Sequence, residues 1–525
     1  MFPKLERLNL SFCMSLSELH PSVGFLDKLV YFDIKDCYNL KMFPRIVNMK
    51  SLQEISFEGC KRLKNFPEIV GRMESLKRMN LSRTAIKEVP SSIGYDLFNL
   101  QVLYLQKCEN LTNLPLSIYE LQDLRYLQLK GCTKLVLIPF LNKEKYCEVL
   151  APTSNSNISH YGKATSIQEA DDDADDGQGN LAFPSLRYFF VGGCYTSDCD
   201  FLVTLGCAST LKQLDFSESN FVSLPASLPK FINLECLNLS GCKRLQDVLE
   251  LPPNLKRLYV RGCVSLERIS KLSNILKHQE SQMFEQLDLS NCWRLCDNLV
   301  QEAEKKGLLV NDGDHQVEVD LFSLFLSSQK SAFRVVFPAS HEILEWFSCQ
   351  MDFKGNGLFE FYIQVLPNFK WENTGLVLYV AADEMLNWGF EIRINKVLVR
   401  SNLDDRFCKG FHEADSARVW LHYIPFDRID MRLFGYRRPL PPFQCRVTIY
   451  QTLNSNVVPL KRCGVHLVMP PNEVCMKLSQ TQNLRNRLKA EVYVDELESS
   501  DSNSKLAYSS REEGPSGLKR GRIDL

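Results

Sequence analysis

The chain has 525 residues, a formal net charge of −1, 45% apolar residues and 24% charged residues. At about 150 residues a domain, this length allows two to four domains of ordinary soluble composition. The charge balance gives no general attraction to nucleic acid or to acidic membranes. The first residues lack the apolar core of a signal peptide, and no run of about 18 apolar residues could span a bilayer.

The cysteines indicate a reducing compartment. There are 19 of them, an odd number in a long chain without a secretion signal, and such thiols are typically reduced. We therefore expect a cytoplasmic protein. The basic residues near the end of the chain, Lys519, Arg520 and Arg522, leave the nucleus open as an alternative.

The N-terminal half is built on a repeated unit. Its pattern, L-x-x-L-x-L-x-x-C, begins at Leu5, recurs in steps of 23 or 24 residues to Leu124, then resumes at Leu186 and continues to Phe284. This spacing fits a short strand followed by a tight arc, and such a unit can bury its apolar face only against its neighbours. The eleven units predict a leucine-rich-repeat solenoid of the α/β class over residues 1–296.

Most units place a cysteine at the ninth position. A residue at a fixed place in each coil meets its equivalents in the adjacent coils, and a small free thiol is among the most often buried side chains. We interpret the column as a structural ladder and not as a metal or disulfide site. Its members are Cys13, Cys37, Cys60, Cys108, Cys132, Cys194, Cys242, Cys263 and Cys292.

An acidic insertion interrupts the repeats at residues 142–183. It contains Glu169–Asp176, with six carboxylates in eight residues. Clustered like charge with few apolar groups cannot support a packed core, so the insertion is predicted to be disordered. Calcium binding is the alternative, but the cluster lacks the spaced ligands and closing glutamate of an EF-hand loop.

A second region begins near Phe333. Residues 297–332 are expected to cap the repeats and to link them to it. Short runs rich in β-branched and aromatic residues, separated by Gly, Pro, Asn or Asp, then predict an antiparallel β-sandwich over residues 333–470. Residues 471–525 are polar and charged, and we expect them to form a disordered tail.

The motifs of common active sites are absent. The sequence has no G-x-S-x-G, no H-E-x-x-H and no paired C-x-x-C, and its one Gly-Lys pair, Gly162-Lys163, lacks the other residues of a phosphate-binding loop. The eight histidines are scattered. We therefore expect no enzymatic activity, no cofactor and no metal site.

Without a catalytic motif, the candidate functional feature of this chain is a binding surface on the repeats. In each repeat, the residues two, four and six after the first leucine should point away from the coil interior, because side chains alternate along a strand. Tyrosine and arginine, which are enriched at binding hot spots, recur there. The candidate partner-binding residues on this concave face are Arg7, Tyr31, Glu54, Arg78, Tyr104, Tyr126, Gln128, Lys130, Arg257, Tyr259 and Arg261.

The repeats resemble those of plant intracellular immune receptors of the TIR–nucleotide-binding–leucine-rich-repeat class, as in LQVLYLQKCENLTNLPLSI. The segments FPASHEILEWFSCQ and CGVHLVMP resemble the opening and closing segments of the jelly-roll/Ig-like domain that follows the repeats in that class. Ala339 and Leu344 depart from the usual opening, which has a glycine and a second proline at those places. The resemblance covers roughly residues 1–470.

This resemblance implies a module that recognises a pathogen effector, or a host protein that the effector modifies, and that restrains the receptor when no effector is present. From the charge balance and the lack of a membrane-spanning run, we expect no nucleic-acid or membrane partner. The TIR and nucleotide-binding parts have no counterpart here, and the chain opens inside a repeat. We therefore expect a truncated product, a fragment or a partial gene model, and do not carry over NAD cleavage or nucleotide binding. The alternative is a regulatory or structural module that restrains or scaffolds a nucleotide-binding partner. An extracellular receptor ectodomain is disfavoured, since its repeats usually carry asparagine in the ladder.

Overall fold

A computed structural model of the chain describes residues 4–137, 182–194, 202, 205–273, 284–306, 332–338, 349–352, 358–365, 374–382, 388–401, 418–426, 431–434, 443–451, 462–468 and 492–493. Most of the predicted insertion, the linker beyond residue 306 and most of the predicted tail lie outside these ranges.

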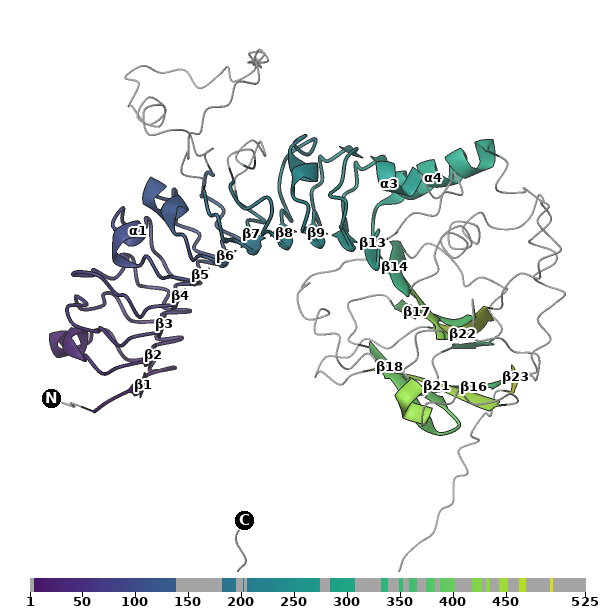
Figure 1. The fold of residues 1–525 in the computed structure, drawn as a ribbon, viewed down its shortest axis with the longest axis horizontal. Helices are drawn as coiled ribbons and strands as arrows, with labels where there is room; N and C mark the ends of the chain where they lie inside the picture. Colours follow the sequence, from purple (N-terminus) through teal and green to yellow (C-terminus); the bar gives the residue numbers. More distant parts are fainter. Residues whose placement is uncertain are drawn as a thin grey trace, which may run out of the picture.

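Short parallel strands line the inner, concave side of an arch (Figure 1). In each strand the middle side chain points into the coil and its two neighbours point out, as with fully buried Leu127 between Tyr126 and Gln128. Strands pair in register, which stacks Leu127 on Leu103 and Phe189. The strands are β1 (Arg7–Asn9), β2 (Tyr31–Asp33), β3 (Glu54–Ser56), β4 (Arg78–Asn80), β5 (Val102–Tyr104), β6 (Tyr126–Gln128), β7 (Tyr188–Phe190), β8 (Gln213–Asp215), β9 (Cys236–Asn238), β11 (Arg257–Tyr259) and β13 (Gln286–Asp288).

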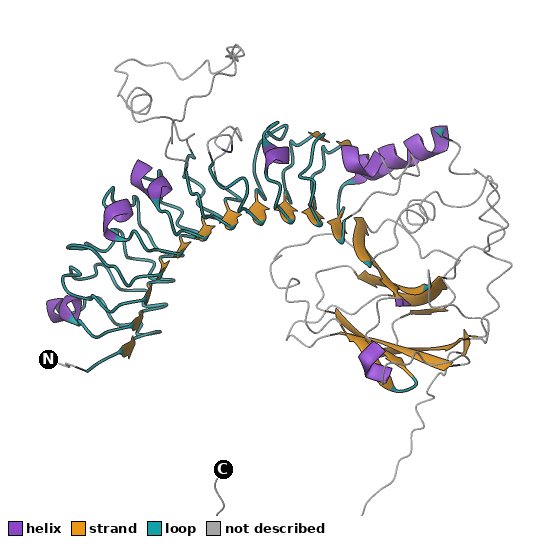
Figure 2. Cartoon of the chain, in the orientation of Figure 1, coloured by secondary structure: helices purple, strands orange, loops and turns teal. Residues whose placement is uncertain are grey.

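Short helical turns lie on the outer side of the arch (Figure 2). They are η1 (Pro21–Phe25), α1 (Ile93–Asp96), η2 (Leu116–Glu120), η4 (Leu228–Lys230) and α3 (Ser270–Ser273), and β10 (Asp247–Val248) pairs there with β12 (Arg268–Ile269). The longer helix α4 (Trp293–Lys305) follows the last repeat strand and buries Leu295, Leu299 and Ala303. This helix covers the C-terminal end of the solenoid core.

The solenoid sheet continues into the C-terminal region. Strand β14 pairs in parallel with β13 and antiparallel with β20, and the order then runs β20-β17-β22-β15. The bounds are β14 (Phe333–Pro338), β15 (Cys349–Asp352), β17 (Gly375–Ala382), β20 (Arg418–Pro425) and β22 (Arg462–Val468). The two regions therefore share one hydrogen-bonded sheet.

A second antiparallel sheet packs on this extension. It consists of β16 (Leu358–Val365), β18 (Trp388–Ile394), β19 (Val397–Ser401), β21 (Phe443–Gln451) and β23 (Val492–Tyr493), with η8 (Met431–Phe434) nearby. Phe361 and Val447 from this sheet share a buried cluster with Leu378 and Val465 from the first. The predicted fold class, a solenoid followed by a mainly β sandwich, is confirmed.

Four details differ from the expectations. Cys13 is exposed, so the buried ladder begins at Cys37. Phe183, placed in the insertion, is buried in the solenoid. The run FEIRINKVLV forms two strands, joined at Asn395 and Lys396, whose positive φ values of 47° and 71° suit a two-residue hairpin turn. Strand β23 lies within the predicted tail and pairs with β16.

Candidate recognition surface

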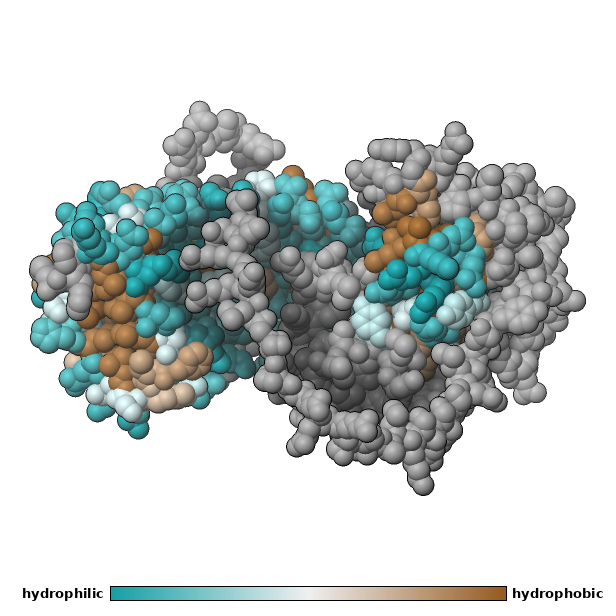
Figure 3. Space-filling view, turned by 90° about the horizontal axis from the view of Figure 1, so that it is seen from below, coloured by the Kyte–Doolittle hydropathy of each residue, from teal (hydrophilic) through white to brown (hydrophobic). Residues whose placement is uncertain are grey.

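The concave face consists of the first and third side chains of each repeat strand. All eleven candidate residues lie on this side of the sheet: nine in those positions, and Lys130 and Arg261 just beyond their strands. Figure 3 views this side, where hydrophilic residues predominate and apolar residues gather at the N-terminal end. The types of side chain on this face change from one end of the arch to the other.

Its N-terminal part is a network of paired charges. Glu58 lies 2.7 Å from the guanidinium of Arg83 and 3.3 Å from the Lys35 amine. Arg78 pairs with Glu54 in the neighbouring strand at 3.6 Å. Candidates Arg78 and Glu54 are therefore partners of each other.

Near the N-terminal end, two further candidates also contact each other. The Arg7 guanidinium lies 4.4 Å from the centre of the Tyr31 ring, a cation–π contact. The Tyr31 hydroxyl donates to Asp33 at 3.2 Å. Burial, the largest cause, and Asp33 raise the pKa of Tyr31.

A turn motif occupies the third strand position in many repeats. The side-chain oxygen of Asn or Asp there accepts a hydrogen bond from the backbone N–H two residues later, which stabilises the turn after the strand. This bond measures 2.9 Å at Asn80, 2.8 Å at Asp215 and 3.0 Å at Asn238. At these repeats the side chain in the third position stabilises the turn after the strand.

In β5, β6 and β7 that position carries no such turn residue, and aromatic side chains gather instead. Tyr104, Tyr126, Tyr188 and Phe190 form what we call the aromatic patch. The Tyr126 ring lies 5.0 Å from Tyr104, 5.8 Å from Tyr188 and 5.2 Å from Phe190, between ring centres. Tyr188 is 36% exposed, and burial raises the pKa of Tyr126 to about 12. The hydroxyl of Tyr126 therefore stays protonated near neutral pH.

Polar groups border the aromatic patch. The side-chain carbonyl of Gln128 is buried and has no hydrogen-bond partner among the described residues. The Lys130 amine lies 3.8 Å from the carboxylate of Asp215, which also accepts a 3.0 Å hydrogen bond from the Asn238 amide. Lys130 is thus held by its own chain, while the Gln128 oxygen is buried without a described partner.

The C-terminal part of the face runs into the sandwich. The Tyr259 hydroxyl donates to Gln286 at 2.6 Å, and burial raises the pKa of Tyr259. Gln286 aligns with Arg334 of β14, and Arg334 aligns with His422 of β20. The His422 ring contacts Phe390 of the second sheet, 5.3 Å between centres. The second sheet of the sandwich therefore packs on the concave side and closes that end of the face.

The structure brings together four of the predicted residues, Tyr104, Tyr126, Gln128 and Lys130. The others lie elsewhere along the arch, where Arg7 contacts Tyr31 and Arg78 pairs with Glu54. Sequence reasoning missed Tyr188 and Phe190. The signal was present, since they stand two and four residues after Leu186, as Tyr126 and Gln128 do after Leu124.

Within the described ranges, no three His, Cys, Asp or Glu side chains converge as a metal site would require. None of the described helices combines the length and apolar character needed to cross a bilayer.

Known proteins are similar to this chain mainly through its repeats. The family described as "Disease resistance protein RPS4B-like, leucine-rich repeats" matches residues 48–141 and 175–293. TMV resistance protein N of Nicotiana glutinosa is 33% identical over 51% of this chain and 24% of its own length. Disease resistance protein RPS4B of Arabidopsis thaliana is 26% identical over 65% of this chain and 23% of its own length.

Solved leucine-rich-repeat structures are more distant. The leucine-rich repeat domain of the type III effector XopL is 22% identical with a TM-score of 0.32, covering 46% of this chain and 69% of that one. The functional domain of InlJ from Listeria monocytogenes, which includes a cysteine ladder, is 14% identical with a TM-score of 0.26, covering 56% of this chain and 57% of that one.

The chain spans about a quarter of the length of both resistance proteins. The leucine-rich-repeat region of this chain is related to that of the plant TIR-NB-LRR disease resistance proteins, of which the chain covers only a part.

Proposed function

We propose that the concave face recognises a protein, either a pathogen effector or a host protein that an effector modifies, as part of a plant defence response. The observation that carries this proposal is the aromatic patch. Tyrosine rings supply large contact areas at low entropic cost and are enriched at the centres of protein interfaces. The hydroxyls of Tyr104, Tyr126 and Tyr188 make no hydrogen bond to another described residue, so they are available to a partner.

The arrangement of the patch supports a protein ligand. Curved repeat sheets suit extended partner surfaces, and the sandwich stands beside the same face. The matched segments are leucine-rich repeats, which supports binding rather than catalysis. The described cysteines are free thiols, which favours a reducing compartment; we place the protein in the cytoplasm, with the nucleus as the alternative.

The test is binding of the full chain to a panel of purified effectors from pathogens of its host and to their host targets. For any binder, Tyr188→Ser should weaken the affinity about tenfold or more, the loss of a hot-spot side chain, without shifting thermal unfolding. The matched control is Tyr95→Ser on the outer side, where Tyr95 is 58% exposed. Equal affinities for both variants would contradict the assignment.

The panel also includes the nucleotide-binding domain of a related receptor. Binding to that domain alone, with no effector or host target bound, is the result expected of a module that restrains a signalling partner. That outcome would replace our proposal.

A further inference from the structure

A second surface lies on the outside of the coil, away from the concave face. Five basic residues follow the strands of three successive repeats and form what we call the basic patch: Lys41, Lys61, Arg62, Lys64 and Lys87. None of the five makes an ion pair with a described carboxylate. Only Lys61 has a described side-chain contact, its amine lying 5.2 Å from the centre of the Tyr38 ring.

Such a gathering of cations is not a general property of this chain, whose net charge is −1. Most other bases on these repeats are neutralised, as Arg45 is by Glu68 at 2.8 Å and Arg83 by Glu58 at 2.7 Å. Exposed cations without ion-pair partners leave a positive surface that attracts anionic groups of a partner.

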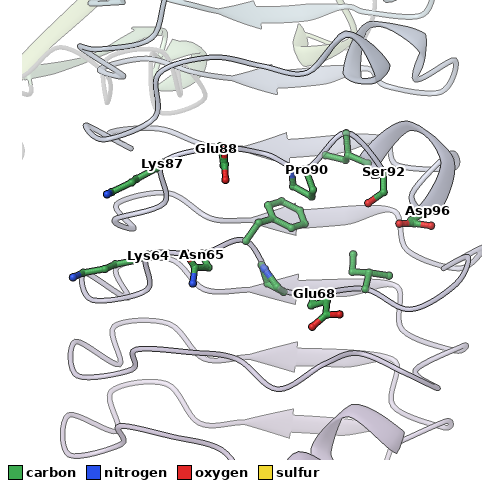
Figure 4. A pocket seen from close by; sticks show the side chains of 12 residues that line it. Lys64, Asn65, Glu68, Lys87, Glu88, Pro90, Ser92 and Asp96 are labelled. Carbon is green, nitrogen blue, oxygen red and sulfur yellow. The ribbon is translucent and has the colours of Figure 1, made fainter.

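A hollow of about 310 Å³ lies beside the basic patch, between the outer segments of two adjacent coils (Figure 4). Phe66, Ile69 and Pro90 give it apolar, half-buried walls, with the buried Ile93 among them. Lys64 and Lys87 stand together at one end, and Glu88 lies between Lys87 and Pro90. This volume is at the small end of ligand sites, enough for one or two amino-acid side chains.

The other end of the hollow is acidic. Glu68 and Asp96 line it, and Ser92 lies beside Asp96. Glu68 is already paired with Arg45, whereas Asp96 forms no described ion pair. A continuous polyanion, such as duplex DNA or an anionic lipid surface, would be attracted at the lysine end and repelled at this end. A peptide can place different charges at the two ends.

We propose that this hollow is a docking site for a short peptide segment of a partner protein that carries acidic residues followed by an apolar residue. The apolar side chain enters the hollow against Phe66 and Pro90, and the carboxylates meet Lys64 and Lys87. The site lies on the opposite side of the coil from the aromatic patch and does not depend on the function proposed for that patch.

The probe is a fluorescein-labelled peptide in which a run of glutamates is followed by leucine and lysine, titrated with the full chain. The double variant Lys64→Glu, Lys87→Glu should weaken binding about tenfold or more, since it replaces two attractive contacts by repulsive ones. The matched control is Lys230→Glu, Lys243→Glu, which makes the same charge change at exposed lysines of later repeats. Thermal unfolding of both variants confirms that each is folded.

A second variant tests the hollow without changing charge. Ser92→Trp should block the hollow. Because the Ser92 side chain makes no capping hydrogen bond at the start of α1, the substitution should leave the backbone hydrogen bonds of that helix intact. The same peptide with serine in place of leucine should bind several-fold more weakly.

Three results would overturn the proposal. They are equal binding of the leucine and serine peptides, unchanged binding by Ser92→Trp, and unchanged binding by the lysine double variant. Lysine-dependent binding of duplex DNA or of phosphatidylserine vesicles, with no binding of the peptide, would reassign the surface to a polyanion.

Discussion

The thiols of the cysteine ladder hold neighbouring coils together through their backbones. Each buried ladder cysteine donates to a carbonyl of the preceding repeat: Cys132 to Leu105 at 3.0 Å, Cys108 to Leu81 at 3.1 Å and Cys292 to Val260 at 2.9 Å. Burial, the first cause for Cys60, raises the pKa of that thiol to about 12, so it stays a neutral donor. The column is structural, as its spacing predicted.

Two repeats break the column, with Thr84 and Ser219 in place of cysteine. The Thr84 hydroxyl donates to the Leu81 carbonyl at 2.7 Å, whereas Ser219 is left without such a bond. Ser219 is 1% exposed, and its hydroxyl has no hydrogen-bond partner among the described residues. A buried polar group without a partner costs about 1–3 kcal/mol. The C–O bond of serine is shorter than the C–S bond of cysteine, so a hydroxyl reaches less far towards the preceding coil than a thiol does.

We predict that Ser219→Cys stabilises the solenoid by about 1 kcal/mol, because the longer thiol restores the bond and removes the unpaired hydroxyl. Urea unfolding followed by circular dichroism measures the change. The reverse substitution, Cys132→Ser, is the control and should destabilise the chain. A lower midpoint for Ser219→Cys would contradict this account of the ladder.

At the scale of elements, the repeat strands were predictable because their signal is local. The leucine spacing alone positions each three-residue strand, and Tyr126–Gln128 lies where it predicts. The aromatic patch depends on which strands are neighbours. Tyr126 and Tyr188 are 62 positions apart in the sequence but lie opposite each other on the paired strands β6 and β7. The pairing of β13 with β14 likewise joins segments that are far apart in the sequence, and no residue pattern in either segment predicts it.

The sandwich carries a buried titratable side chain on β22. His466 is 3% exposed, and burial lowers its pKa to about 4, below the usual value of about 6.5 in an unfolded chain. Between these values the unfolded state binds more protons than the folded state, so stability falls as the pH falls from 6.5 towards 4. Burial also lowers the pKa of His422, with Arg334 and Arg400 adding to the effect.

We predict that lowering the pH from 7 to 5 reduces the unfolding free energy of the sandwich by about 2 kcal/mol through His466 alone. Urea titration followed by tryptophan fluorescence measures this, because Trp388 and Trp420 lie in the sandwich. His466→Leu should have a shallower pH dependence over this range. An unchanged dependence in that variant would show that His466 is not the group responsible.

At the scale of the molecule, the solenoid and the sandwich share a sheet and a core. One buried cluster contains Leu287 of the last repeat, Val335 of β14 and Leu421 of β20. Such continuity predicts that the two regions unfold as one cooperative unit, unlike domains joined by a flexible linker.

We predict that Val335→Asp separates one calorimetric unfolding transition into two. Val335 is 2% exposed, and a carboxylate there would be buried without a partner. Gln444→Asp, at an exposed position on β21, is the control and should leave one transition. Two transitions in the unaltered chain would contradict the coupling.

The central claim is that the aromatic patch on the concave face contacts a protein partner. The most direct measurement replaces Tyr188 with the photo-reactive residue benzoylphenylalanine, expresses the chain in leaves inoculated with a pathogen and identifies crosslinked proteins by mass spectrometry. We predict a crosslinked effector or host target at position 188, and none when Tyr95 on the outer side is replaced. The same crosslinked protein at both positions, or none at position 188 in leaves where the partner is shown to bind, would contradict the claim.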